Sequence, residues 1–153
     1  MRQIAGDLIA LAKAGHFDVI AHGCNCFNVM GAGLAAQIAR HFPEAAAADA
    51  RTAPGDPAKL GTLSEALVVI GAHRLHVVNA YTQHHYAGGG VLVDYAAVAS
   101  CMAHLKRRHG GRRIGLPQIG AGLAGGHWPT LEEIIRSALA GEDLTIVTFK
   151  PQT

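Results

Sequence analysis

The chain has 153 residues, of which 50% are hydrophobic and 16% are charged. This length fits one domain, and the hydrophobic fraction supplies a sizeable core, which argues against intrinsic disorder. The formal net charge of +2 is too small to indicate nucleic acid or an anionic membrane as the main partner. We therefore expect a single domain over residues 1–153.

Cysteine usage and the lack of long apolar runs indicate the compartment. No apolar run approaches the roughly 20 residues that cross a bilayer, and the stretch MRQIAGDLIALAKAG lacks the pattern of a signal peptide. Cys24, Cys26 and Cys101 are odd in number, and the first two are too close in sequence to pair comfortably. These features suit a reducing compartment, so we expect a soluble, cytoplasmic protein. We also expect it to be a monomer.

The first half of the chain alternates β-branched runs with alanine-rich stretches, which is typical of a layered α/β domain. The run FDVIAH, flanked by glycine, predicts a buried strand. Leu34, Ile38 and Phe42 share one helical face, and Pro43 either stops that helix or restarts it. In order, we expect a strand over 2–5, a weak helix to about residue 14, a strand over 17–22 and a helix over 34–42.

The second half continues this alternation. Two β-rich runs, 62–70 and 75–81, are joined by a short stretch around Gly71, which predicts a tight antiparallel connection. After a glycine-rich gap, Asp94 is expected to cap a helix whose last turn is basic. The remaining expected elements are a strand over 113–116, a helix over 128–139 entered through Pro129, and a closing strand over 144–149.

Glycine is abundant, with 19 residues, and it clusters in loops that follow predicted strands. These loops are Gly6-Asp7, the stretch Gly31-Ala32-Gly33 and the stretch 120–125. In open α/β sheets, ligands collect where such loops meet at the strand ends. The second loop opens a helix whose free N–H groups favour a phosphate, and glycine in the third lets backbone N–H groups approach an anion. Two phosphate cradles suggest a diphosphate ligand.

The stretch 120–125 also matches the dinucleotide fingerprint GxGxxG, which raises a nicotinamide-dependent oxidoreductase as an alternative. That fingerprint belongs in the first βαβ unit of a Rossmann fold, with an acidic residue after the next strand. Here only one predicted strand follows it, so this alternative fits poorly. A P-loop ATPase fits less well, because neither glycine loop is followed by Lys and Ser or Thr.

Histidines and cysteines near these loops suggest a metal hypothesis. A Cys-x-Cys pair without a matching second pair is not a standard zinc knuckle, so packing is the simpler interpretation of the cysteines. A zinc-dependent hydrolase nevertheless remains a third hypothesis. The residues that could in principle converge on zinc are His22, Cys24, Cys26, His84, His85 and His127.

Taken in this order and spacing, the loops resemble those of the macro domains, which bind ADP-ribose, and in particular the branch of ADP-ribose 1''-phosphate phosphatases and related ADP-ribosyl hydrolases. The resemblance covers nearly the whole chain and implies an α/β fold: a three-layer α/β/α sandwich around a mixed, roughly six-stranded sheet, with the ligand cleft across the strand ends. Its carriers are Gly6-Asp7-Leu8, His22-Gly23-Cys24-Asn25-Cys26, Gly31-Ala32-Gly33-Leu34-Ala35, and Pro117-Gln118-Ile119-Gly120-Ala121-Gly122-Leu123 with Trp128.

The resemblance implies a role for each loop. Asp7, with Leu8 beside it, is similar to the carboxylate that accepts a hydrogen bond from the adenine amino group, which is chemically consistent because adenine presents an N–H donor. Asn25 resembles the asparagine at the distal ribose. The loops expected to clamp the diphosphate and distal ribose contain Gly31, Ala32, Gly33 and Leu34 on one side and Gly120, Ala121, Gly122, Leu123, Ala124 and Gly125 on the other.

The sequence departs from the family at two places. One hydrolase branch uses an aspartate and a lysine, whereas this chain has Ala124 at the aspartate position and no lysine in the equivalent region, so we do not expect a covalent lysine–aspartate mechanism. After the central strand comes the segment 79–86, followed by three glycines. We expect this segment to form a lid that carries aromatic and imidazole groups, with Tyr81 among the ligand contacts.

The leading hypothesis is a metal-independent hydrolase that removes a substituent from the distal ribose of ADP-ribose: a 1''-phosphate, an acyl ester or a protein link. His22 is the first candidate for general base or acid, and His127 is the second, because the imidazole pKa of about 6.5 suits proton transfer near neutrality. Asn25 is also expected among the catalytic residues, through an amide that can both donate to and accept from the hydroxyls of the distal ribose.

The alternative is a binding module that recognises ADP-ribose or an ADP-ribosylated molecule without turning it over. In either case the ligand is ADP-ribose, with no separate cofactor, no membrane partner and no direct contact to nucleic acid.

Overall fold

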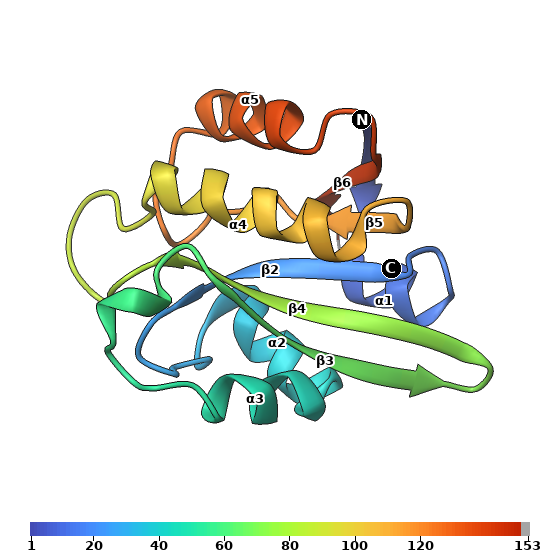
Figure 1. Ribbon diagram of the computed structural model, residues 1–153, viewed down its shortest axis with the longest axis horizontal. Coiled ribbons are helices and arrows are strands. Elements are labelled where there is room, and N and C mark those ends of the chain that lie inside the picture. The colour runs from blue at the N-terminus through green and yellow to red at the C-terminus, as the bar shows by residue number, and fades with distance from the viewer. Residues whose placement is uncertain (151–153) are drawn as a thin grey trace.

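The computed structural model describes residues 1–150, which form one mixed six-stranded sheet flanked by helices (Figure 1). The elements are β1 (Arg2–Gly6), α1 (Leu8–Lys13), β2 (Val19–Asn25), α2 (Gly33–His41), α3 (Pro43–Ala50), the 3-10 turn η1 (Pro57–Lys59), β3 (Leu63–Ile70), β4 (His73–Gln83), α4 (Tyr95–His109), β5 (Arg113–Leu116), α5 (Trp128–Ala138) and β6 (Asp143–Phe149).

The strand order is β1-β6-β5-β2-β4-β3, and only β3 pairs antiparallel with its neighbour. The carboxyl ends of the other five strands therefore lie at one edge of the sheet. The loops after β1, β2, β4 and β5 leave the sheet there, which brings together segments far apart in the sequence.

Helices cover both faces of the sheet and make it the middle of three layers. Figure 1 shows α4 and α5 on one side and α2 and α3 on the other. The alternation of β2 explains this: Val19 and Ala21 join the core cluster under α4 and α5, and Ile20 joins the cluster that contains residues of α1, α2 and α3. The expected α/β/α sandwich with a mixed sheet is confirmed.

The predicted elements are all present, with shifted ends. Pro43 restarts the chain as the separate helix α3, because its fixed φ suits the first helical turn. β2 begins at Val19, not at Phe17. Among residues 1–150, no helix has the length and apolarity needed to span a membrane.

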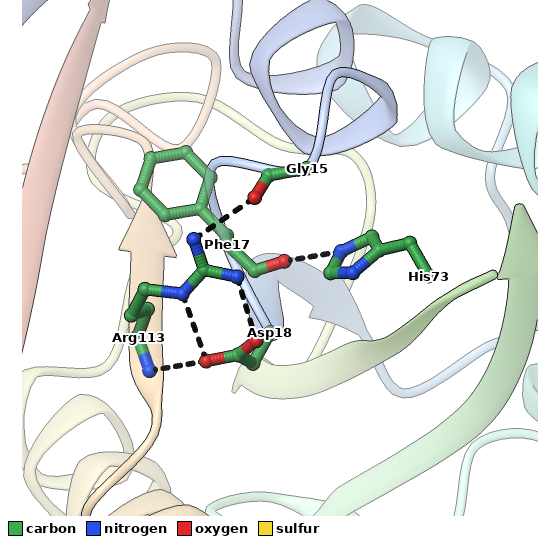
Figure 2. A network of polar contacts seen from close by, with 5 residues as sticks. All are labelled: Gly15, Phe17, Asp18, His73 and Arg113. Atoms are coloured by element: carbon green, nitrogen blue, oxygen red, sulfur yellow. Dashed lines mark hydrogen bonds and ion pairs between the residues drawn. The ribbon is translucent and has the colours of Figure 1, made fainter.

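The entry to β2 is fixed by a polar network at the amino ends of the central strands (Figure 2). Arg113 at the start of β5 donates from Nε and a terminal nitrogen to the two carboxylate oxygens of Asp18, at 3.1 and 2.8 Å. Its other terminal nitrogen donates to the carbonyl of Gly15, and His73 contacts the carbonyl of Phe17 at 2.7 Å. Phe17 and Asp18, the two residues expected to begin the strand, therefore contact His73 of β4 and Arg113 of β5 instead. We call these contacts the clamp.

Arg113 also lowers the pKa of Asp18 to about 2, chiefly through the side-chain hydrogen bond. Because the folded-state pKa lies below the unfolded value, the contribution of Asp18 to stability is present above about pH 4 and is lost as the pH falls toward 2.

We predict that Asp18→Asn lowers the free energy of unfolding by about 1–2 kcal/mol at pH 7, because it weakens a two-pronged charged contact that is partly exposed to solvent. Urea denaturation at pH 7 and pH 2.5 measures this, and the difference between variant and wild type should shrink at the lower pH. Glu133→Gln, on the exposed side of α5, is the control and should match the wild type. Equal stability of Asp18→Asn and wild type at pH 7 would contradict the role of this clamp.

Candidate ligand cleft

A cleft of about 760 Å³ lies across the carboxyl ends of the parallel strands. One of its ends lies at the exits of β1 and β6, the middle at β5 and β2, and the other end at β4. The strand order gives this direction, because β1 is at one edge of the sheet and β4 is next to the opposite edge. Its lining includes Asp7, Leu8, Val147 and Phe149 at the first end, residues 31–35 and 117–124 in the middle, and Asn25, Thr82, Gln83, Tyr86 and Leu92 toward the second.

The two glycine loops expected to cradle a diphosphate meet in this cleft. Gly33 has a φ of +59°, and a Cβ built on it would lie 2.9 Å from Cδ1 of Leu123 in the loop after β5. Gly31, Ala32, Gly120 and Gly122 also line the cleft. The predicted juxtaposition of the two loops is therefore confirmed, and a side chain at position 33 would require the side chain of Leu123 to move.

The start of α2 presents backbone donors to the middle of the cleft. Its N-cap residue, Ala32, makes no side-chain capping hydrogen bond, and Gly33, Leu34 and Ala35 of the first turn all line the cleft. The first N–H groups of a helix have no partner within the helix, and they carry the positive end of its dipole. This arrangement favours an anion between the two loops.

Asp7 lies at the β1 end of the cleft and caps α1. Its Oδ1 accepts a hydrogen bond from the backbone N–H of Ala10 at 3.0 Å. The capping role thus occupies one carboxylate oxygen and leaves acceptor capacity on the other. Asp7 is the one acidic residue in the lining formed by residues 1–150, and this lining contains no Lys or Arg.

Asn25 lies at the end of β2 and shapes the following loop. Its amide oxygen accepts from the backbone N–H of Phe27 at 2.9 Å, and its amide nitrogen donates to the carbonyl of Val29 at 2.7 Å. The side chain therefore forms a local turn, and it lines the cleft as well. An amide nitrogen carries two hydrogens, so one donor remains for a ligand.

His22 lies in the cleft wall, but its imidazole is 99% buried. Asn79 donates from its amide nitrogen to Ala45 and Ser64, so its oxygen is the acceptor for Nε2 of His22, 2.7 Å away. This assignment leaves Nδ1 as the unprotonated nitrogen, and Nδ1 lies 3.7 Å from the thiol of Cys24. Burial lowers the pKa of His22 to about 4, so the ring is neutral at pH 7.

A general base has to reach the proton that it removes. The fixed tautomer and buried ring of His22 make it less suited to that role than the sequence alone indicates, and the catalytic assignment stays a prediction.

Three predicted site residues lie outside the cleft lining. Tyr81 is 1% exposed, and its hydroxyl contacts Asp49 at 2.7 Å and Ser64 at 2.8 Å on the side of α3, because side chains alternate along β4 and Thr82 is the neighbour that lines the cleft. The expectation that Tyr81 contacts the ligand is therefore wrong.

His127 and Gly125 also lie outside the cleft lining, and their predicted roles stay predictions. The imidazole of His127 is held 3.0 Å from the hydroxyl of Thr130 in the first turn of its own helix, and it does not line the cleft. The N–H of Gly125 closes a turn onto the carbonyl of Gly122, and a Cβ at Gly125 would lie 3.1 Å from the carbonyl of Gly90. Gly125 is thus an exposed residue beside the segment after β4, and it does not line the cleft.

Lys59 binds the loop that follows β2 and stabilises its conformation. Although it is charged, it is 93% buried, and its ammonium donates to the carbonyl of Cys26 at 2.9 Å and to the side-chain oxygen of Asn28. The same ammonium lies 4.9 Å from the centre of the Tyr81 ring. Asn28 has a φ of +60°, a conformation that asparagine tolerates better than most residues. No sequence motif indicates this support, since Lys59 is a single lysine between predicted elements.

Four aromatic and imidazole rings, from the loops after β2 and β4, pack against one another beside the cleft. We call Phe27, His84, His85 and Tyr86 the ring cluster. Phe27 lies 5.1 Å from His84, 4.7 Å from His85 and 5.9 Å from Tyr86, measured between ring centroids. Of these four, Tyr86 lines the cleft. The expected aromatic segment is present, and Phe27 is the member that the sequence pattern did not identify.

The residues of the zinc hypothesis do not gather at one point. Within residues 1–150, the one group of metal-ligating atoms that lie close together is formed by Glu65, His76 and His109, none of which belongs to the expected set. Glu65 is paired with Arg108 and accepts a hydrogen bond from His109, which lowers its pKa. These contacts attach the end of α4 to β3 and β4, away from the cleft lining.

The chain matches the family model described as Macro domain over residues 21–135. It is 35% identical to an uncharacterised 17.5 kDa protein of Enterobacteria phage T4, over 99% of this chain and 97% of that protein. Among solved structures, it is similar to the macrodomain of Mycobacterium tuberculosis DarG, with a TM-score of 0.70 and 21% identity, covering 99% of this chain and all of that one. Thermosipho africanus DarTG, solved in complex with ADP-ribose, matches with a TM-score of 0.70 and 16% identity, over 99% of this chain and 42% of that one.

We predict that His22 makes stability depend on pH. Because its folded-state pKa of about 4 lies below the unfolded value of 6.5, the unfolded chain takes up a proton between these pH values that the native protein does not. Stability should therefore fall by about 2 kcal/mol between pH 7 and pH 5 on account of this residue.

Urea denaturation at the two pH values measures the effect. His22→Gln, which keeps a donor for Asn79, should lose correspondingly less stability on acidification. His16→Gln, at an exposed position, is the control and should behave as the wild type. An equal pH dependence in His22→Gln and wild type would contradict the buried neutral state of His22.

Proposed function

Because the chain belongs to the macro domain family, we propose that its cleft binds ADP-ribose and that the protein hydrolyses a substituent on the distal ribose. The observation that carries the proposal is the meeting of two glycine turns over the start of α2, which offers backbone N–H groups to a diphosphate. The cleft lining formed by residues 1–150 has no Lys or Arg, so in this proposal the diphosphate is held by backbone donors and the helix dipole.

The strand order supports one orientation of the ligand. Asp7 at the β1 end would accept from the adenine amino group, the glycine turns would hold the diphosphate, and Asn25 at β2 would contact the distal ribose. Leu8, Val147 and Phe149 would supply apolar contacts at the adenine end. The ADP-ribose in the Thermosipho africanus complex, a structure of the same fold, agrees with this ligand class.

For the hydrolytic step, we propose that the bound ADP-ribose derivative places the bond to its substituent beside a water held near Asn25, so that positioning supplies much of the rate. The water adds to the phosphorus or carbon that it attacks as this bond breaks, and the products are ADP-ribose and the released substituent. Nδ1 of His22 would be the candidate base, which requires the cleft wall around Cys24 to open by a side-chain movement. In this proposal no metal takes part, because backbone donors can stabilise the negative charge that develops.

A second candidate function is a reader that binds ADP-ribose without turnover. The observation in its favour is the buried state of His22, whose Nε2 is engaged with Asn79 and whose ring has the Cys24 thiol 3.6 Å from Nε2 and 3.7 Å from Nδ1. Both functions share the ligand contacts, and turnover separates them.

For Asp7 we predict a change in base specificity. Asp7→Asn should keep the cap of α1, since asparagine is as good an N-cap as aspartate, but its amide nitrogen would face the adenine amino group. We expect ADP-ribose affinity to fall about 10-fold and affinity for the hypoxanthine analogue, IDP-ribose, to rise relative to wild type. Isothermal titration calorimetry with both ligands measures this. A parallel change for the two ligands would mean that Asp7 does not contact the base.

We predict that Gly122→Val abolishes measurable ADP-ribose binding and leaves the melting temperature unchanged. A Cβ at Gly122 meets nothing within 4 Å, so the branched side chain fits the free protein but occupies the space of the diphosphate. Gly89→Val is the matched control, because it is equally open and lies outside the cleft lining. Full binding by Gly122→Val would place the diphosphate elsewhere.

Turnover is tested with ADP-ribose 1''-phosphate, O-acetyl-ADP-ribose and an ADP-ribosylated protein, each with and without a chelator. We expect release of ADP-ribose from at least one of them, unaffected by the chelator, and a decrease of about 100-fold or more in His22→Gln. Binding without turnover of any substrate would support the reader, and activity lost on chelation would support the zinc-dependent hydrolase. Full activity of His22→Gln would remove His22 as the base.

A further inference from the structure

The β4 end of the cleft is built from aromatic and neutral groups. Tyr86 lines the cleft and is 50% exposed, and its ring stacks on that of His85 with a centroid distance of 4.6 Å and an interplanar angle of 24°. Phe27 contacts both rings from the β2 side. A half-exposed ring fixed by stacked neighbours can accept another flat group at little cost in side-chain entropy.

This end also contains a buried polar group without a partner. Thr82 is 1% exposed and lines the cleft, and its hydroxyl oxygen makes no hydrogen bond to the described part of the chain. That oxygen would lie 2.8 Å from a Cβ on Gly23, so the glycine keeps space open in front of it. An unpaired buried hydroxyl is costly, and a polar ligand atom would satisfy it.

The charge of the cleft argues against a phosphate at this end. Asp7 is the one acidic side chain of the described lining, and no Lys or Arg is present to neutralise a dianion. The start of α2 and the glycine turns lie in the middle of the cleft, where the diphosphate of the proposed ligand would occupy them. A further phosphate beyond the distal ribose would therefore be desolvated against aromatic rings without a counter-charge.

We propose that the β4 end of the cleft is a subsite for a planar ring attached to the anomeric carbon of the distal ribose, and that it disfavours a phosphate there. This inference rests on the proposed binding of ADP-ribose and names the class of substituent that the site takes. The planar ring stacks on Tyr86, and a polar atom at its edge or on the ribose reaches the hydroxyl of Thr82.

The segment after β4 is attached to the glycine loop after β5, which fixes the position of this subsite. The backbone N–H groups of Leu92 and Val93 donate to the carbonyl of Ala124 at 2.8 and 3.2 Å. Gly90 packs against Gly125. Tyr86 is thus connected, through 87–91, to the same loop that faces the diphosphate position, so the ring and phosphate subsites are parts of one cleft.

The experiment compares three ligands that share ADP-ribose and differ in the substituent at the anomeric carbon. These are ADP-ribose itself, NAD+, which carries a planar nicotinamide, and ADP-ribose 1''-phosphate. Calorimetry on the wild-type chain should give the tightest binding for NAD+ and the weakest for the 1''-phosphate, at least 5-fold apart. Binding of none of the three would contradict the proposed function, and tighter binding of the 1''-phosphate than of NAD+ would overturn this inference alone.

Variants at the two ends of the cleft test the position of the ring. Tyr86→Ala should weaken NAD+ binding by about 5- to 100-fold, the usual effect of losing an aromatic partner, and ADP-ribose binding by a clearly smaller factor. Tyr86→Phe should keep the preference for NAD+, because stacking does not need the hydroxyl. Phe149→Ala, at the adenine end, is the matched control and should weaken both ligands by the same factor. Equal losses for both ligands in Tyr86→Ala would overturn the assignment.

Discussion

The feature on which the cleft depends is the approach of two glycine-containing turns at the carboxyl end of the sheet. The turn before α2 and the turn after β5 both line the cleft, and a methyl group at Gly33 would meet the end of the Leu123 side chain. Parallel strands make this possible, because β2 and β5 are neighbours and both end at the same edge. The gap left by the missing side chains is where backbone N–H groups can face an anion without a lysine or arginine.

Several polar side chains near this gap are buried and bonded to neighbouring elements of the fold. His22 is bonded to Asn79, Tyr81 to Asp49, and Lys59 to the loop carbonyl of Cys26, so each of these three side chains makes a buried polar contact. Buried polar groups are retained where their partners are complete, and each of these contacts joins an element behind the cleft to a strand or loop that forms it. Among residues 1–150, the free groups are fewer: Asn25 retains one amide hydrogen, and the hydroxyl of Thr82 and Nε2 of His84 are buried without a hydrogen-bond partner.

The cleft therefore divides into regions of different character. Its middle is polar through backbone atoms, its β1 end carries the carboxylate of Asp7, and its β4 end is aromatic. Such a division suits a long ligand whose parts differ in chemistry, as in the proposed complex with ADP-ribose. It also means that substituent selectivity and diphosphate binding reside in different loops, those after β4 and β5, which are joined through Ala124.

The sequence by itself determined the layered fold, the order of strands and helices, and the glycine loops, because hydrophobic period and glycine clustering are local properties of the chain. It also placed Asp7, Asn25 and Gly120–Ala124 correctly at the cleft. Only the tertiary structure decided which face Tyr81 takes and where the His127 ring turns. It also revealed that the rings of Phe27 and Tyr86 meet. The orientations of these side chains depend on the exact residue at which each strand begins to alternate and on contacts between loops that are far apart in the sequence. A local sequence pattern contains neither kind of information.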